Sequence, residues 1–86
     1  MILGAYSIRD VHTGFLAPMF ELNDAVAVRN FSAAVLSRQP GNVMFMSSAD
    51  YELFKIGEFD SELGRLIPCD PVPVVSAGSI VRGSEV

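Results

Sequence analysis

The sequence predicts an α+β domain in which an antiparallel sheet of three to four strands packs against one main helix. Two segments, residues 2–9 and 51–59, alternate in side-chain character with a period of two, which is typical of strands. Between them, residues 24–38 repeat apolar side chains at helical spacing. Because 86 residues leave room for only one core, we expect one compact domain over residues 1–75. Residues 76–86 are expected to form a C-terminal tail or edge strand.

The first expected element is the strand over residues 2–9. It places Tyr6 and Ile8 on one face and Ser7 and Arg9 on the other. Residues 10–18 are rich in Asp, Thr, Gly and Pro, which favour turns and loops. The following residues 19–22 then fit a short extended piece that leads into the helix.

The second element is the helix over residues 24–38, with Asn23 or Asp24 as its N-cap because a short side-chain oxygen accepts from the free amides of the first turn. The sequence Gln-Pro-Gly-Asn at residues 39–42 ends it. One side of this helix is expected to face the core, and it carries Ala25, Val28, Phe31, Ser32, Val35 and Leu36.

The remaining chain predicts a β-hairpin. Residues 43–46 fit either the start of a strand or a buried loop, and residues 47–50 have the spacing of a capping box that begins one helical turn. The strand over residues 51–59 turns at residues 60–64, where Gly64 can take a positive φ. Prolines at 68, 71 and 73 limit the returning strand to residues 65–67 or to a sheet edge. Residues 74–75 or 79–81 could add one more edge strand.

Composition excludes several classes of protein. One cysteine and one histidine allow neither an internal disulfide nor a multi-site zinc module. No apolar stretch approaches the roughly 18–20 residues of a membrane span. The net charge of −4 lies wholly in residues 47–86, whereas residues 1–46 are neutral and carry three arginines. A nucleic-acid surface would therefore draw on Arg9, Arg29 and Arg38.

No catalytic constellation stands out. His12 and Asp10 lie close together but have no nucleophile at a recognisable spacing, and Cys69 has no neighbouring His or second Cys. The glycines form no phosphate-binding motif. The acidic residues 50–62 fit a solvated edge better than a metal site. We expect no enzyme activity, no metal site and no cofactor.

Aromatic side chains next to basic ones offer the main binding signal. Tyr6 lies near Arg9 and Phe54 lies beside Lys55, and rings on a sheet can stack on the bases of single-stranded DNA. The alternative is that a domain of this size needs its rings for the core. The small size and the apolar residues 44–46 also favour self-association into a homodimer or higher oligomer.

Several segments taken together resemble a known family. Members open with a Y-S-I/V-x-D strand, then have an aromatic–Pro–Phe stretch, an N-D/G-x-A-x-R-x-F helix and an acidic aromatic hairpin with a late Gly. In order and spacing, residues 3–68 resemble the small non-structural protein of gokushovirus-type microviruses (Microviridae), tailless bacteriophages with circular single-stranded DNA. The matching residues are Tyr6 to Asp10, Phe15 to Phe20 around Pro18, Asn23, Asp24, Ala27, Arg29, Phe31, Asp50, Tyr51, Leu53, Phe54, Ile56, Gly57, Phe59, Asp60 and Gly64. The chain departs from the family in its apolar residues 42–46 and in its tail after Pro68.

The resemblance implies a non-structural protein of the infected bacterial cytoplasm that assists viral DNA replication. No catalytic residues belong to the family. DNA binding would fall to Arg9 and Arg29, with Arg38, Lys55 and Arg65, and with Tyr6 and Phe54 as stacking rings. Two alternatives stay open: a module that docks on a phage or host replication protein without touching DNA, and a minor virion or scaffold component.

Overall fold

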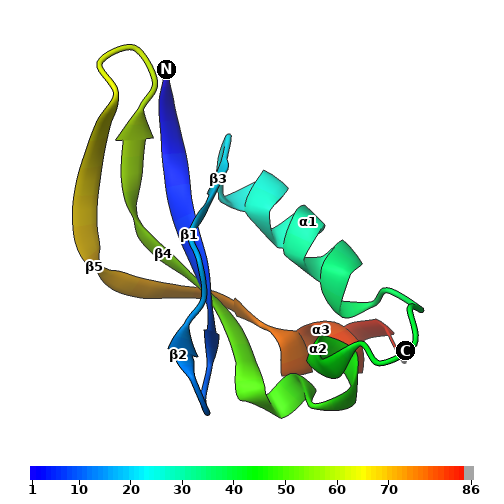
Figure 1. Cartoon of the computed structure of the whole chain (residues 1–86). Coiled ribbons are helices and arrows are strands. Elements are labelled where there is room, and N and C mark those ends of the chain that lie inside the picture. Colours follow the sequence, from blue (N-terminus) through cyan, green and yellow to red (C-terminus); the bar gives the residue numbers. More distant parts are fainter. Residues whose placement is uncertain (85–86) are drawn as a thin grey trace.

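A computed structural model of the chain describes residues 1–84 and shows a curled antiparallel sheet with helices at one end (Figure 1). The strands are β1 (Ile2–Asp10), β2 (Gly14–Phe15), β3 (Met19–Glu21), β4 (Tyr51–Asp60) and β5 (Arg65–Ser76). β1 is central. β4 pairs along one of its edges and continues to β5, while β2 and β3 pair with the other edge. The predicted mixture of α and β structure with an antiparallel sheet is confirmed, although the sheet has five strands.

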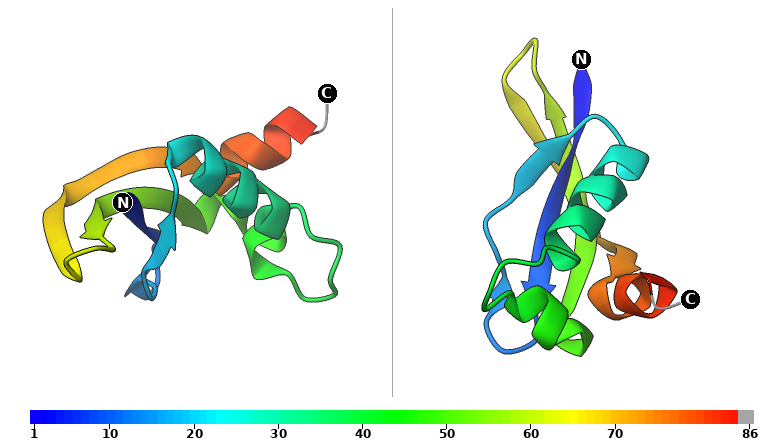
Figure 2. Two further views of the ribbon diagram at one scale, coloured as in Figure 1. Left: turned by 90° about the horizontal axis from the view of Figure 1, so that it is seen from above. Right: turned by 90° about the vertical axis from the view of Figure 1, so that its right-hand side faces the viewer.

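The returning strand β5 follows the second of the two expected courses, since it lies at the edge of the sheet. It runs for 12 residues through Pro68, Pro71 and Pro73, instead of ending at residue 67. A strand at a sheet edge tolerates prolines because one row of its amides has no partner. The β4–β5 register shifts near Phe54 and again between Lys55 and Gly57. Such irregularities bend strands, and Figure 2 shows β4 and β5 arching together.

The helices also depart from the prediction. The main helix α1 (Asp24–Val35) begins as expected, with Asn23 Oδ1 accepting from the Val26 amide at 2.9 Å. It ends at Val35 rather than residue 38, because the Asn42 side-chain amide donates to the carbonyls of Ala34 and Val35 at 3.0 and 3.1 Å. In a longer helix those carbonyls would accept from the amides four residues on.

Two further helical segments replace expected loops and strands. Residues 43–46 form the short helix α2 (Val43–Met46), followed by the 3₁₀ turn η1 (Ser48–Asp50). Of the expected C-terminal segment, Ser76 ends the edge strand β5, whereas Ala77–Ser84 forms helix α3 instead of a tail or strand and buries Ala77 completely. Residues 85–86 of the expected tail lie outside the described residues.

The hydrophobic core lies at the helical end of the molecule. The residues of the buried cluster are Tyr6, Ala27, Phe31, Val35, Leu53 and Ala77. Of the expected helix face, Phe31 and Val35 are buried, whereas Ala25 and Leu36 are exposed, because Ala27 turns inward instead. The other end of the sheet, residues 2–5 with residues 56–68, extends away from the helices and is called the hairpin arm below (Figure 1). The molecule is therefore elongated, at 41 × 25 × 21 Å.

Tyr6 connects the sheet to the main helix. Its hydroxyl donates a hydrogen bond to Asp24 Oδ1 in the first turn of α1, and its ring is fully buried. The ring reaches that position by lying over Gly4, where a Cβ would come within 2.5 Å of it. Burial, followed by the hydrogen bond to Asp24, raises the pKa of Tyr6 well above its ordinary value.

Tyr6→Phe should lower the free energy of unfolding by about 1.5 kcal/mol, because it removes a hydrogen bond to a charged acceptor. The folded state raises the pKa of Tyr6, so this contribution is complete below about pH 10 and is lost as the pH rises further. Urea unfolding of both proteins between pH 7 and pH 11 measures it. Tyr51→Phe is the comparison: burial and the nearby Asp10 raise the pKa of Tyr51 as well, but its ring is only half-buried, so its loss should be smaller; an equal loss in both variants would contradict the special role of Tyr6.

Gly57→Ala should destabilise the hairpin arm by about 2 kcal/mol, since an added methyl group there forces the backbone to move. Gly57 is buried at the register shift, and a Cβ would collide with the carbonyl oxygen of Ile67. Gly83→Ala is the control, because nothing lies within 4 Å of a Cβ at Gly83. Thermal unfolding should separate the two variants; a neutral Gly57→Ala would show that the arm can relax freely.

Candidate nucleic-acid interface

The face of β1 that points away from the helices carries small side chains. Tyr6 and Ile8 belong to or pack against the core, so the alternation of the strand sends Ala5, Ser7 and Arg9 to the opposite face. Directly paired residues on neighbouring strands point to the same side of a sheet. The partners of Ala5 and Ser7 therefore share this face, which is called the open face below.

One aromatic pair lies across Ser7 on the open face. Phe54 of β4 pairs with Ser7, and Phe15 of β2 pairs with Arg9. The two rings meet edge to face, with centroids 5.3 Å apart and planes at 75°. The Ser7 hydroxyl donates to the Leu16 carbonyl at 2.6 Å, which holds the segment after β2 against β1. Phe15 remains 47% exposed, so this pair presents ring surface to solvent.

A second aromatic pair lies across Ala5. Phe20 of β3 pairs with Ala5, and Phe59 of β4 pairs with the neighbouring Leu3. Their ring centroids are also 5.3 Å apart, with the planes tilted by 48°. In both pairs the rings come from strands on opposite sides of β1, and a small β1 residue lies between them. The open face is therefore an aromatic surface that runs along the central strand.

Arg9 is the basic residue of the expected set that lies on the open face beside a ring. It is exposed and lies opposite Phe15 on one side and Glu52 on the other. Within residues 1–84, no carboxylate oxygen lies within 4.0 Å of its guanidinium. Arg9, Phe15 and Phe54 form the aromatic–arginine cluster, which has a cation free to meet a phosphate next to a ring that can stack.

The remaining expected residues do not gather at this cluster. Tyr6 is the clearest correction: it is 0% exposed and its ring fills the core, so it has no free surface on which a base could stack. Lys55 pairs with Tyr6, on the helical side of the sheet. Arg65 begins β5 opposite Asp60, at the tip of the hairpin. Arg29 is exposed on α1.

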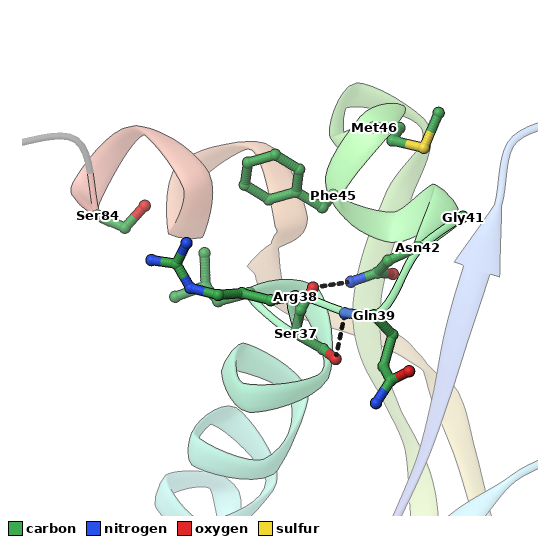
Figure 3. Close-up of a pocket in the computed structure, with 9 residues that line it drawn as sticks. Ser37, Arg38, Gln39, Gly41, Asn42, Phe45, Met46 and Ser84 are labelled. Atoms are coloured by element: carbon green, nitrogen blue, oxygen red, sulfur yellow. Dashed lines mark hydrogen bonds between the residues drawn. The ribbon is translucent and has the colours of Figure 1, made fainter.

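Arg38 lies in a pocket of about 480 Å³ at the end of α1. Its guanidinium extends across the opening toward Ser84 of α3, and Phe45 of α2 forms another wall (Figure 3). Asn42 braces the loop by donating to the Ser37 carbonyl at 3.0 Å. This pocket lies among α1, α2 and α3, whereas the aromatic–arginine cluster lies on the face of the sheet that points away from the helices, so the two are separate surfaces.

His12 and Cys69 have structural surroundings. The His12 amide donates to Asp10 Oδ1 at 2.9 Å, and its imidazole Nε2 lies 3.3 Å from Asp50 Oδ2, linking the turn after β1 to η1. Cys69 is an exposed thiol on β5.

In the part of the chain that the structure describes, no three His, Cys, Asp or Glu side chains converge as a metal site would need. Across the same residues, no helix is long and apolar enough to span a bilayer.

Sequence reasoning identified Phe54 and Arg9 but did not single out Phe15, Phe20 and Phe59. A signal for them was present in the alternation of β1, which places Ala5 and Ser7 on one face. Small residues on a central strand leave space that larger side chains from the flanking strands can fill. The three rings therefore depend on strand pairing, which the sequence alone did not supply.

The comparisons with known proteins give one match. The model of the Phage ORF5 protein family matches residues 3–80, from β1 into α3. The searches of curated proteins and of solved structures matched nothing. The matched range contains Arg9, Phe15 and Phe54, and it confirms the phage origin that the sequence segments indicated. The chain is therefore a bacteriophage protein and belongs to the Phage ORF5 protein family.

Proposed function

We propose that this phage protein is a non-structural protein of a microvirus of the gokushovirus type, and that it assists replication of the viral single-stranded DNA in the host cytoplasm. In this proposal it catalyses no reaction and holds single-stranded DNA on its open face, as an oligomer. The observation that carries the proposal is the aromatic–arginine cluster: the partly exposed rings of Phe15 and Phe54 next to the unpaired guanidinium of Arg9.

Stacking supplies most of the proposed affinity. A base that stacks on an aromatic side chain contributes about 1–3 kcal/mol, and it does so with little sequence preference. The cationic contribution is small, because Arg9 lies across from Glu52 and the chain carries a net charge of −4. The logarithm of the binding constant falls linearly with the logarithm of the salt concentration. For single strands, each phosphate contact makes that slope steeper by about 0.7. Because the site has one arginine, we expect its affinity for DNA to fall only weakly as the salt concentration rises.

A second candidate function is docking on a phage or host replication protein. The tip of the hairpin favours it, because Glu58, Asp60 and Glu62 are close in sequence there and would repel DNA. A protein partner with a basic surface would fit that acidic tip. Capture of the phage initiator protein by the wild type, and its loss in Glu62→Gln, would support this candidate.

Phe54→Leu and Phe15→Leu should each weaken binding of a labelled oligothymidylate about tenfold, because leucine keeps an apolar side chain but provides no ring for stacking. Fluorescence anisotropy at low salt measures the dissociation constants. Phe45→Leu is the matched control: Phe45 is as exposed as Phe15, at 47%, but lies on α2. Wild type that binds no oligonucleotide, or equal weakening by Phe45→Leu, would refute this DNA site.

Arg9→Gln should weaken the same complex a few-fold and make the salt slope shallower by about 0.7, the value for one lost phosphate contact. Arg29→Gln removes an equally exposed charge from α1 and should leave the slope unchanged. Titrations at several salt concentrations give both quantities. If the two variants change the slope equally, the charge acts at long range and Arg9 does not contact the DNA.

A further inference from the structure

An apolar groove of about 160 Å³ lies on the open face of the hairpin arm. It is separate from the aromatic–arginine cluster and includes Phe20 but neither Phe15 nor Phe54. Among the nine lining residues only Glu58 has an ionisable side chain, and Glu58 pairs with Gly4, on the other side of the strand from Phe59 and Leu66. The side chains that line it on the open face are Ala5, Phe20, Leu66 and Pro68.

Two large apolar side chains that line the groove are exposed to solvent, whereas a stable monomer normally buries such side chains in its core. Leu66 is 68% exposed and Phe20 is 42% exposed. The chain exposes 5537 Å², whereas a compact protein of 9.3 kDa exposes about 5,000 Å². Its radius of gyration is 13.4 Å, against about 12 Å for a compact domain of this length. The chain therefore exposes about 500 Å² more than a compact fold of its mass, and the apolar side chains of the arm, with Leu66 at 68% and Ile67 at 47% exposed, contribute to that excess.

A second copy of the chain could cover this additional exposed surface. If each of two copies covered this excess on the other, they would bury about 1,000 Å² in total, about the minimum expected of a biological interface. The groove carries no charge, so two copies can meet there despite the net charge of −4 of each. DNA would gain no electrostatic attraction at this place. A two-fold interface needs a patch that is complementary to itself, and an uncharged apolar face meets that condition.

Both edges of the sheet are poorly suited to pairing with a strand of another chain, so contact between two copies is favoured through a face of the sheet. On β5, Pro68, Pro71 and Pro73 provide no amide hydrogens, so this outer edge is a poor template for another strand. The opposite edge is formed by the very short β2 and β3. Association by continuing the sheet is therefore unfavourable at both edges, whereas two antiparallel sheets pack well face to face at about 10 Å.

We infer that the groove of the hairpin arm is the interface of a homodimer, in which Leu66 and Phe20 of each copy pack against the arm of the other. The inference deepens the oligomeric part of the proposed function and rests on it. The dimer leaves the aromatic–arginine cluster of each copy outside the groove, so DNA binding and dimerisation are separate properties. A dimer that binds no DNA would refute the proposed DNA site and leave this interface intact.

The test is sedimentation equilibrium of the full chain from micromolar to near-millimolar concentration. Wild type should approach twice the mass of one chain, and Leu66→Glu should raise the dissociation constant about tenfold or more, since it places a charge in an apolar contact. Leu63→Glu is the matched control. Leu63 is exposed to the same degree, at 65%, and lies in the same hairpin but does not line the groove. Its dimer should match that of the wild type.

Three results would overturn the inference: a wild type that stays monomeric over the whole range, a folded Leu66→Glu variant that dimerises as tightly as the wild type, or a Leu63→Glu variant that dissociates as much as Leu66→Glu. Circular dichroism confirms that each variant is folded. If Leu66→Glu does not fold, Leu66→Gln replaces it with a neutral polar side chain of similar size.

Discussion

The hydrogen bond between Tyr6 and Asp24 is the constraint on which the arrangement of sheet and helix depends. Gly4 has no side chain, so the Tyr6 ring can lie over it and reach the first turn of α1. That contact fixes where the helix starts, and two and three turns later Phe31 and Val35 lie in the cluster that contains Leu53. Sheet and helix therefore pack as they do because a glycine precedes a tyrosine by two residues on the central strand.

The same strand organises the opposite face by the same physical means. Gly4 leaves space for a ring on the helical side, while Ala5 and Ser7 leave space for two ring pairs on the open face. Had β1 carried large side chains at those positions, the flanking phenylalanines could not have met across it. The aromatic surface is thus a consequence of strand composition, and Arg9 is close to it because it follows Ser7 by the two-residue period of the strand.

Local signals explain what could be predicted from the sequence. The β1 alternation, the Asn23 cap and the Gly64 turn, where φ is +66°, depend on a few neighbouring residues, and all three are present. The prolines left two courses for β5, a short strand or an edge strand, and the structure has the edge strand; its length of 12 residues could not be predicted, because it depends on pairing with β4. Tyr6 was expected to bind DNA because alternation separates two faces without saying which face a helix will cover. Phe54 and Arg9 were found by the same alternation, but their partner Phe15 needed the pairing of β2 with β1.

The division of the molecule into a core end and a hairpin arm links stability to assembly. Among residues 1–84, seven hydrophobic side chains are buried, all but Ala5 in the cluster at the helical end, so a single copy has a small core for a chain of 86 residues. Apolar surface on the arm contributes nothing to that core until something covers it. If a second copy does so, association stabilises the folded state by mass action, because only the folded arm presents the groove. The exposed apolar residues of the arm then have a physical reason to stay exposed in the monomer. Asp60 and Glu62 at the tip of the hairpin do not line the groove, so in such a pair their charge would oppose association beyond two copies.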